Sequence, residues 1–448
     1  MSKLLVHGGR FVDPGRTVDE LADVLLVDGL VATVGPNLDT EGTEVIDAAG
    51  LVVSPGFVDI HTHLRDPGQE YKETISTGTE AAARGGFTTV CCMPNTEPAI
   101  DTRATVEYVL RTAATSGHVR VLPIGCVSRG REGHELAELA DLAEAGCVAF
   151  SDDGSPVADG ALLRHAMEFA SISGLTVIDH CEDAAISDGG VMHEGWVSTR
   201  LGLRGQSAAA EETAIARDIA VAAETGLPLH LAHISTRAAV DLVRAAKQRG
   251  LSITAEVTPH HLTLTHRAVA FGENGMRDGD ALLYDTNSKV NPPLRSAADV
   301  AACVEGLREG VIDAIATDHA PHADYEKACE FDEAAFGISG LETAFGLCMT
   351  LVHSGALELP TLIERLTSGP VRALGLERSV PGLGSLTEGA PGDLVLLDPE
   401  AEWTVEPERF ASKGRNTPLA GRTLKGKVVA TIYNGDVVWS QERVDSNA

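Results

Sequence analysis

The chain has 448 residues, 44% of them hydrophobic and 22% charged, which excludes a disordered protein and favours one large globular domain with a smaller one. Its 35 basic and 65 acidic residues give a formal charge of -30, which argues against nucleic acid or an anionic membrane as a partner. An anionic substrate would therefore need a local positive centre.

Residues 1–6 do not resemble a secretion signal, and no apolar run is long enough to span a bilayer. The eight cysteines include no CxxC pair. We interpret them as reduced, structural thiols and expect a cytoplasmic enzyme.

Both ends of the chain carry signals of β-structure. Residues 24–34 and 427–439 each predict a hairpin, with Asp28-Gly29 and Asn434-Gly435 as the turns. Residues 392–398 predict one more strand. Because the ends differ from the middle, we expect residues 1–54 and 385–448 to meet in one composite β-sandwich domain.

In the middle, residues 55–384, short apolar strands alternate with segments of helical spacing. The eight predicted strands are 56–60, 87–93, 119–127, 148–151, 176–180, 229–233, 253–257 and 312–317. Predicted helices include 77–84, 135–145, 161–171, 211–225 and 237–247. This alternation predicts an α/β protein with a (β/α)8 barrel, in which chemistry lies at the C-terminal ends of the strands. The Gly- and Asp-rich residues 271–285 predict a loop.

The first barrel strand ends in two histidines, His61 and His63, with Arg65 two residues further on. Side chains alternate along a strand, so both imidazoles project to the same side and can hold one divalent metal. The guanidinium of Arg65 can hold a substrate carboxylate through paired hydrogen bonds. An isolated pair of this kind more often only closes a strand, so the remaining strand ends decide the interpretation.

Four further predicted strands also end in polar residues. These strand ends carry Asp152 and Asp153, His180, His233, and Asp318 followed by His319. Imidazole and carboxylate ligands with open positions suit zinc, with manganese, cobalt and iron as alternatives. A carboxylate shared by two histidine pairs would make a two-metal site, which can activate water and polarise a carbonyl group.

Six motifs follow one another along the chain: Asp59 to Gly68, Met93 to Thr96, Ser151 to Gly154, Lys289 to Arg295, Asp318 to His322 and Phe336 to Thr343. With these motifs the chain resembles the dihydroorotases of the amidohydrolase superfamily. It is similar to the class I type, in which the second metal carboxylate is an aspartate instead of a carboxylated lysine. The resemblance implies a distorted TIM-like barrel with a β-sandwich built from both termini.

The resemblance also implies a role for each motif residue. Two Zn2+ per subunit are expected, with His61, His63 and Asp318 on the first, His180 and His233 on the second, and Asp153 bridging them. Asp152 is the less favoured neighbour, because the family's ligand directly precedes the glycine. The substrate-binding residues would be His63, Arg65, Asn95 and His322 near the carboxylate, and Asn291 with the backbone of Phe336 and Gly337 near the ring amides.

The implied reaction is the reversible hydrolysis of (S)-dihydroorotate to N-carbamoyl-L-aspartate, the third step of pyrimidine biosynthesis. A hydroxide between the metals would attack the ring carbonyl, and Asp318 would carry its proton to the leaving nitrogen. The family suggests a homodimer. The sequence leaves open an association with aspartate transcarbamoylase.

Two other functions compete. Hydantoinases, dihydropyrimidinases and allantoinases act on rings without this carboxylate and generally use a carboxylated lysine, yet residues 148–154 contain no lysine. A non-catalytic dihydroorotase-like partner of aspartate transcarbamoylase would have lost metal ligands, whereas every ligand position is filled here.

Several nearby residues are expected to be structural. His260 and His261 are expected in the pocket wall, His319 is expected to turn away from the metals, and Asp59 is expected to support a ligand histidine. Lys289 and Arg295 are expected to form ion pairs. Residues 323–335 are interpreted as a lid in which Lys327 is a solvated charge.

Overall fold

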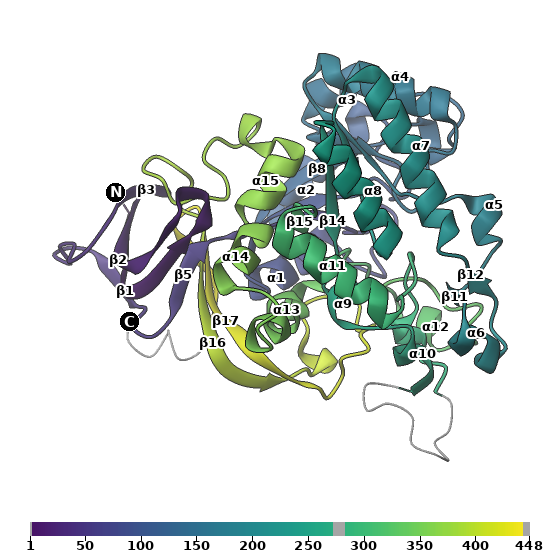
Figure 1. Ribbon diagram of the computed structural model, residues 1–448. Helices are drawn as coiled ribbons and strands as arrows, with labels where there is room; N and C mark the ends of the chain where they lie inside the picture. Colours follow the sequence, from purple (N-terminus) through teal and green to yellow (C-terminus); the bar gives the residue numbers. More distant parts are fainter. Residues whose placement is uncertain (1, 272–282, 442–448) are drawn as a thin grey trace.

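The computed structural model describes residues 2–271 and 283–441, so most of the loop predicted at 271–285 lies outside the described residues. Two large sheets organise the chain (Figure 1). The purple N-terminal strands and the yellow C-terminal strands lie together, and the barrel lies beside them.

The barrel sheet consists of eight strands in the order β15-β14-β13-β10-β9-β8-β7-β6, and its neighbours are parallel. The strands are β6 (Phe57–Thr62), β7 (Phe87–Cys92), β8 (Arg120–Gly125), β9 (Ala149–Ser151), β10 (Thr176–Asp179), β13 (Leu229–Leu231), β14 (Ile253–Val257) and β15 (Ala314–Ile315). The predicted barrel is therefore confirmed, strand by strand.

Helices follow most of the barrel strands and cover the outside of the sheet (Figure 1). The longer ones are α1 (Ile75–Arg84), α2 (Arg103–Ser116), α3 (Leu139–Ala145), α4 (Gly160–Ile172), α7 (Ala209–Thr225), α8 (Arg237–Gln248), α11 (Ala297–Glu309), α13 (Ala344–His353), α14 (Leu359–Leu366) and α15 (Ser368–Leu374).

Short elements decorate the loops. They are α5 (Ala184–Ser187), α6 (Trp196–Leu201), α9 (Pro259–Thr263), α10 (Arg267–Phe271), α12 (Asp324–Lys327), β11 (Met192–His193), β12 (Gly205–Gln206), and the 3-10 turns η1 (Pro14–Arg16), η2 (Arg129–Arg131), η3 (Thr286–Ser288), η4 (Leu341–Thr343), η5 (Leu376–Arg378) and η6 (Pro407–Arg409).

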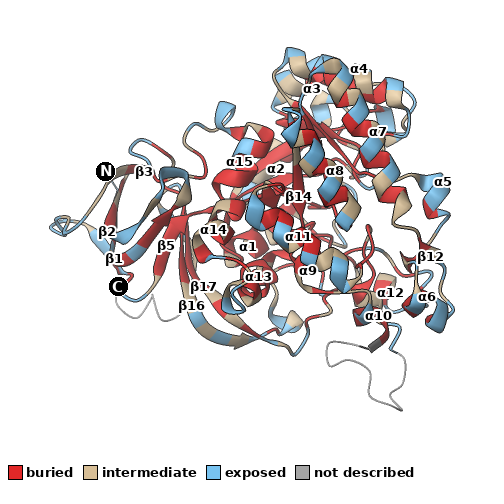
Figure 2. Ribbon diagram, in the orientation of Figure 1, coloured by how far each residue is buried: buried red, intermediate tan, exposed pale blue. Residues whose placement is uncertain are grey.

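The barrel strands are buried on both faces, as Figure 2 shows by their red colour. This burial explains why apolar residues predominate in these strands without a regular alternation of apolar and polar positions. The covering helices are amphipathic. In α8, Ala239, Val240, Val243 and Ala246 form the buried stripe, and Thr236 caps the first turn by accepting a hydrogen bond from the Ala239 N–H.

The barrel closes between its first and last strands. Thr62 forms a parallel bridge with His319, just beyond β15. The buried carboxylate of Asp59 accepts hydrogen bonds from the Thr317 N–H (3.1 Å) and hydroxyl (2.5 Å), and from the His61 N–H (3.1 Å). Asp59 therefore supports His61 through its backbone and also ties the two strands together.

The second sheet joins the two ends of the chain in the order β18-β17-β16-β5-β1-β2-β3, with β4 paired to β1. Its strands are β1 (Lys3–Asp13), β2 (Val18–Val27), β3 (Leu30–Gly35), β4 (Glu44–Asp47), β5 (Val52–Pro55), β16 (Leu394–Thr404), β17 (Thr423–Tyr433) and β18 (Asp436–Ser440). β5 pairs with β16, which links the N-terminal and C-terminal halves directly before β6 enters the barrel.

Both predicted hairpins are present in this sheet. Asp28 and Gly29 have φ values of 48° and 82°, and Asn434 and Gly435 have 49° and 81°, as type I′ turns require. One apolar cluster draws side chains from β1 to β5, β16 and β17, so the sheet curls around its own core.

No helix among the described residues has the length and apolarity to cross a bilayer. All eight cysteines are free thiols, and all except Cys329 are buried.

Replacing Asp59 with alanine tests the barrel closure. The substitution leaves the buried N–H groups of His61 and Thr317 without an acceptor, which costs about 1–3 kcal/mol for each group. We expect a clearly lower urea midpoint for Asp59→Ala. Asp19→Ala removes an exposed ion pair with Arg10 and should change stability by less than about 0.5 kcal/mol. Equal midpoints for the two variants would contradict the closure role.

Candidate metal centre

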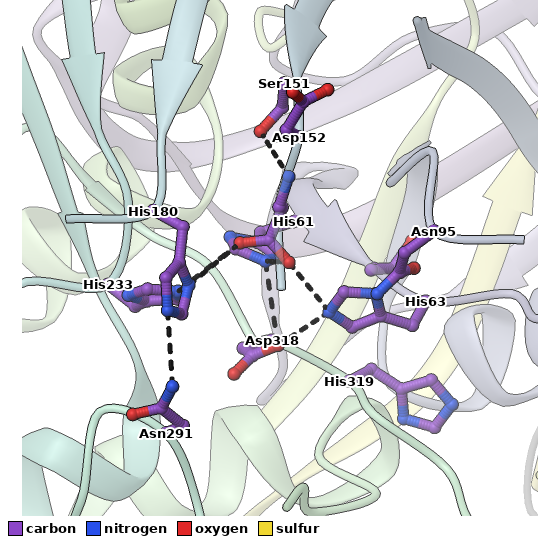
Figure 3. Close-up of polar contacts among 12 residues, drawn as sticks. His61, His63, Asn95, Ser151, Asp152, His180, His233, Asn291, Asp318 and His319 are labelled. Carbon is purple, nitrogen blue, oxygen red and sulfur yellow. Dashed lines mark hydrogen bonds and ion pairs between the residues drawn. The ribbon is translucent and has the colours of Figure 1, made fainter. Parts of the chain in front are cut away.

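Four histidines and two aspartates converge at the C-terminal ends of the barrel strands, and Figure 3 labels the four histidines and one of the aspartates, Asp318. They are His61 at the end of β6, His63 just beyond it, Asp153 after β9, His180 after β10, His233 after β13 and Asp318 after β15. All six side chains are buried. All six residues lie at or within three residues of a strand end. Because the parallel strands all end at one rim of the barrel, these side chains meet there.

The first half of the cluster contains His61, His63, Asp318 and one oxygen of Asp153. Asp318 Oδ1 lies 3.0 Å from His63 Nε2 and 3.6 Å from His61 Nε2. Asp153 Oδ2 lies 3.3 Å from His61 Nε2 and 3.5 Å from His63 Nε2.

The second half contains His180, His233 and the other oxygen of Asp153. Asp153 Oδ1 lies 3.4 Å from His180 Nδ1 and 3.5 Å from His233 Nε2. The two imidazole nitrogens are 3.0 Å apart. The carboxylate of Asp153 therefore faces both histidine pairs, with one oxygen toward each.

These groups fit a metal ion. Neither His61 Nε2 nor Asp153 Oδ1 has a hydrogen-bond partner within residues 2–271 and 283–441, although both atoms are buried. Ligands about 2.0–2.1 Å from a tetrahedral zinc lie about 3.3 Å apart, close to the spacings found here. The sets His61, His63, Asp318 and His61, Asp153, His233 could each hold an ion. The clusters are therefore compatible with a metal site.

Asp152 points away from this cluster. Its carboxylate accepts hydrogen bonds from the N–H groups of Val127 (2.9 Å) and Ser128 (3.0 Å) and from the Ser128 hydroxyl. Burial raises the pKa of Asp152, whereas the neighbouring histidines hold the pKa of Asp153 well below its usual range despite burial. Of the two adjacent aspartates, only Asp153 faces the histidines.

Gly154 allows this turn to pack tightly. Its φ is +81°, and a Cβ there would lie only 3.2 Å from both Asn95 Nδ2 and Arg131 Nη2. Arg131, which no sequence motif marks, donates to the carbonyl oxygens of Asp153 (2.8 Å) and Asp152 (3.3 Å). It fixes the backbone from which Asp153 projects.

Two glutamates that were not predicted lie behind the histidines. Glu256, on β14, has Oε1 at 2.5 Å from His61 Nδ1 and Oε2 at 3.1 Å from His230 Nε2. Burial opposes its ionisation, but His61 and His230 lower the pKa of Glu256 to about 2. Glu182 Oε2 lies 3.2 Å from His180 Nε2. An apolar strand pattern hides Glu256, and no motif marks Glu182.

Arg65 is a buried guanidinium that meets no carboxylate within hydrogen-bonding distance in residues 2–271 and 283–441. Its closest polar contacts are Pro321 O (3.4 Å) and His322 Nε2 (3.5 Å). Burial lowers the pKa of Arg65 to about 10, so it stays charged at neutral pH. An unpaired buried cation is costly, and an anionic ligand would compensate it.

Asn95 lies between His63 and Gly154. Its Oδ1 lies 2.8 Å from His63 Nδ1, which leaves its Nδ2 group as a donor.

The remaining predicted contact residues already have partners within the protein. His322 Nε2 lies 2.8 Å from Phe336 O. The Gly337 N–H donates to Lys289 O (2.9 Å), and the Gly337 carbonyl accepts from Asn416 (3.0 Å). A carbonyl oxygen has two lone pairs, so Phe336 O and Gly337 O can each accept a second donor.

Asn291 faces the second half of the cluster (Figure 3). Its Nδ2 donates to Glu182 Oε2 (2.8 Å) and lies 3.3 Å from His180 Nε2. Its Oδ1 accepts from Gln206 Nε2 (3.2 Å). This chain of contacts fixes which end of the Asn291 amide faces the centre.

The histidines that were expected to be structural are all buried. His260 and His261 lie on α9 instead of a strand, and His261 is hydrogen-bonded to Thr258 (2.8 Å) and Pro292 O (2.9 Å). His319 turns away from the cluster as predicted, with Nε2 at 3.3 Å from Glu73 (Figure 3).

The predictions for the basic residues had mixed outcomes. Arg295 pairs with Glu211 at 3.1 Å, as predicted. Lys289 instead donates to the carbonyls of Phe331 (2.8 Å) and Asp332 (2.9 Å), so the ion pair predicted for it is wrong.

The prediction of a solvated Lys327 is also wrong, because its side chain is buried with 6% exposure. Its ammonium donates to the carbonyls of Thr286 (3.0 Å), Lys289 (3.3 Å) and Ala335 (2.6 Å). An ammonium group has three N–H donors, so Lys327 can satisfy three backbone acceptors at once.

The chain is similar to known proteins over nearly its whole length. A family model described as "Dihydro-orotase-like" matches residues 50–239. A dihydroorotase of Pelotomaculum thermopropionicum is 53% identical over 443 residues, covering 99% of both chains. One from an Anaeromyxobacter strain is 51% identical over 443 residues, again covering 99% of both. The chain belongs to the dihydroorotase family.

Solved structures of cyclic amidases share the fold of this dihydroorotase-family chain. An L-hydantoinase (dihydropyrimidinase) from Arthrobacter aurescens superposes with a TM-score of 0.85 at 26% identity, covering 98% of this chain and 96% of that one. A dihydropyrimidinase from Brevibacillus agri gives a TM-score of 0.83 at 22% identity, covering 97% and 94%. The chain is thus a metal-dependent cyclic amidohydrolase with a TIM-type barrel fold.

The buried ammonium of Lys327 predicts a dependence of stability on pH. Burial, reinforced by Lys289, lowers the pKa of Lys327 from 10.5 to about 7. Between these values only the unfolded chain keeps the proton, so stability rises with pH by up to about 1.4 kcal/mol per unit. We expect unfolding free energies from pH 7 to 10 to rise more steeply for the wild type than for Lys327→Met.

The exposed Lys425 provides a control, since it is paired with Glu400 at the surface. Lys425→Met should follow the wild-type slope over the same range. Parallel curves for the wild type and Lys327→Met would show that the Lys327 ammonium does not lose its proton in this range.

Proposed function

We propose that the chain catalyses the reversible hydrolysis of (S)-dihydroorotate to N-carbamoyl-L-aspartate. One observation carries this proposal: the six-residue His/Asp cluster lies beside Arg65, a buried cation that lacks a carboxylate partner among the described residues. Dihydroorotate carries a ring amide that the cluster could cleave and one carboxylate that could pair with Arg65. Its two functional groups therefore complement the two parts of the site. The family relationship supports the same activity.

We infer that the cluster holds two Zn2+ ions. His61, His63 and Asp318 would hold one, His180 and His233 the other, and Asp153 would bridge them through its two oxygens. When bound, zinc supplies Lewis-acid polarisation of a carbonyl group and makes water a nucleophile near neutral pH.

Arg65 and Asn95 would bind the substrate carboxylate. The guanidinium offers paired donors, and the Asn95 Nδ2 group is available because Oδ1 is engaged with His63. His322 would complete the clamp by exchanging Phe336 O for a carboxylate oxygen. This clamp fixes the ring with its scissile amide toward the cluster.

Asn291 and the carbonyl oxygens of Phe336 and Gly337 would hold the ring. Asn291 is oriented by Glu182 and Gln206, and the two carbonyls keep a lone pair for a ring N–H. A ring held at both ends can present only one amide bond to the cluster, which lowers the entropic part of the barrier.

Asp318 would move the proton. Water adds to the C4 carbonyl carbon while the C4–N3 bond breaks, and Asp318 carries one water proton to N3. Ring closure is the reverse, with Asp318 returning that proton as water leaves. The Asp318 carboxylate lies 3.0 Å from His63 Nε2, at the edge of the cluster. From there it could accept a proton from the water oxygen and donate it to N3 of the ring.

We further propose a domain organisation, a cellular location and an oligomeric state for the protein. Residues 55–384 would form the catalytic unit, supported by residues 1–54 and 385–448. The protein would work in the cytoplasm in pyrimidine biosynthesis and form a homodimer, which light scattering would measure. Co-elution with aspartate transcarbamoylase would show whether the two enzymes associate.

The structural likeness to a hydantoinase makes a hydantoin-type activity the second candidate. Hydantoin and dihydrouracil carry no carboxylate and would leave Arg65 unpaired. A non-catalytic role would require an incomplete cluster, and a zinc count on the purified protein distinguishes that case.

Asp318→Asn tests the proton carrier. An amide keeps the shape of the side chain but cannot accept and return the proton, so we expect zinc content near the wild-type level and a loss of kcat of about 100-fold or more. Metal analysis and an assay of dihydroorotate ring opening check both parts. Near-normal turnover at full zinc content would refute the assigned role.

Arg65→Met tests the carboxylate clamp. Losing a charge-assisted pair of hydrogen bonds costs about 1.5–3 kcal/mol, so KM for dihydroorotate should rise about 10- to 150-fold. Any residual activity on dihydrouracil should be unchanged, because that ring has no carboxylate. If the variant loses activity equally on dihydroorotate and dihydrouracil, Arg65 contributes to folding or to the chemical step and does not bind the substrate carboxylate.

Asp153→Asn and Asp152→Asn form a matched pair of adjacent substitutions. We expect Asp153→Asn to lower zinc content, since it removes the charge that faces both histidine pairs. Asp152→Asn should keep its zinc and lose stability by about 1–3 kcal/mol, because Asp152 accepts hydrogen bonds from the backbone after β8. The reverse pattern would move the bridging role to Asp152.

A further inference from the structure

Each histidine of the cluster can bind metal only through a nitrogen that carries no proton. The proton must then lie on the other ring nitrogen, and the partner of that nitrogen decides which form is stable. Inward-facing atoms are Nε2 in His61, His63 and His233, but Nδ1 in His180. The outward partners of these rings therefore determine whether the cluster is prepared for metal.

Glu256 is the outward partner of His61. An ionised carboxylate only accepts hydrogen bonds, so its 2.5 Å contact keeps the proton of His61 on Nδ1 and leaves the lone pair on Nε2. The second oxygen of Glu256 contacts His230, whose Nδ1 lies 2.8 Å from the Thr254 hydroxyl. Glu256 is only 1% exposed, and in the described chain its ion-pair partners are these two imidazoles.

A buried carboxylate without a lysine or arginine partner needs a positive charge nearby. His61 lies directly between Glu256 and the inner cluster, so a cation on Nε2 would supply that charge through the ring.

Glu182 is the outward partner of His180. Its Oε2 atom lies 3.2 Å from His180 Nε2, so the proton stays on Nε2 and the lone pair on Nδ1 faces Asp153. This contact explains why His180 turns Nδ1 inward when the other three histidines turn Nε2 inward. The same oxygen accepts from Asn291 Nδ2 at 2.8 Å, so Glu182 also touches the proposed ring-binding residue.

His63 differs from both, since its outward partner is the neutral amide of Asn95 at 2.8 Å. The two carboxylates are therefore divided between the halves of the cluster, with one behind the first half and one behind the second.

We propose that Glu256 and Glu182 are positioning residues that each set the metal affinity of one half of the centre. Glu256 holds His61 in the form protonated on Nδ1, and Glu182 holds His180 in the form protonated on Nε2. Partners of this kind typically contribute 10- to 100-fold in metal affinity. The inference rests on the proposed metal centre. The experiment below gives different results if the metal centre is wrong and if only the role of the two glutamates is wrong.

The experiment compares Glu256→Gln and Glu182→Gln with the full-length wild type. Zinc-loaded protein is titrated with a chelator while the zinc that it releases is measured. Long-range 15N–1H spectra of the imidazoles report which ring nitrogen carries the proton in the metal-free protein. Both substitutions keep the size of the side chain but remove its charge.

We expect each variant to weaken one zinc ion by 10- to 100-fold and to leave the other near wild type. Among the four cluster histidines, Glu256→Gln should change the proton position of His61, and Glu182→Gln that of His180; His230, which also contacts Glu256, should respond to Glu256→Gln as well. Glu182→Gln should also raise KM for dihydroorotate, because its oxygen orients Asn291.

Glu342→Gln is the matched control. Glu342 is a largely buried carboxylate that accepts from the N–H groups of Ala411 (2.9 Å) and Ser412 (3.3 Å), outside the centre. Its zinc release and imidazole spectra should match the wild type.

A wild type that binds no zinc would remove the metal centre itself. A wild type that holds two zinc ions, with unchanged affinities and unchanged proton positions in both variants, would overturn this inference alone. Should Glu256→Gln fail to fold, Glu256→Asp keeps the charge but moves it back by one methylene group. Its affinity must then fall below the wild type with a disturbed His61 signal, and wild-type behaviour would count against the proposal.

Discussion

The carboxylate of Asp153 is the group on which the arrangement of the site depends. It stands between two histidine pairs, and its two oxygens lie 3.3–3.5 Å from the four inward-facing nitrogens. Four imidazoles would not gather in a buried space without a negative charge among them, because their lone pairs repel and their protonated forms repel more strongly. The backbone beneath Asp153 is accordingly fixed by Arg131 and by the tight turn at Gly154.

The barrel supplies the positions that this carboxylate needs. Six ligand-type side chains come from five different strands, so the geometry is only as precise as the closure of the sheet. Asp59 makes that closure and also holds the backbone of His61. A loosened closure would therefore displace His61 and Asp318 together, which links the stability of the fold to the geometry of the site.

The sequence allowed much of this to be predicted, for a physical reason. His61, His180, His233 and Asp318 directly follow apolar runs, and the ends of parallel strands must meet at one rim. Glu256 escaped prediction because it sits within a strand and projects into the barrel, where strand patterns predict apolar residues. Lys327 was misjudged because a charged residue in a loop is usually solvated, and only the fold shows that three carbonyls surround it.

The charges around the proposed centre explain how an acidic protein can bind an anion. The cluster contains two carboxylates, from Asp153 and Asp318, and two more lie behind its histidines, from Glu256 and Glu182. The four positive charges of two divalent cations would equal the four negative charges of these carboxylates. Arg65 then remains as one uncompensated positive charge in a buried position, and the single carboxylate of dihydroorotate matches it. On this balance, removing either outer glutamate leaves an excess of positive charge at its half of the centre, so that half should release its metal ion first.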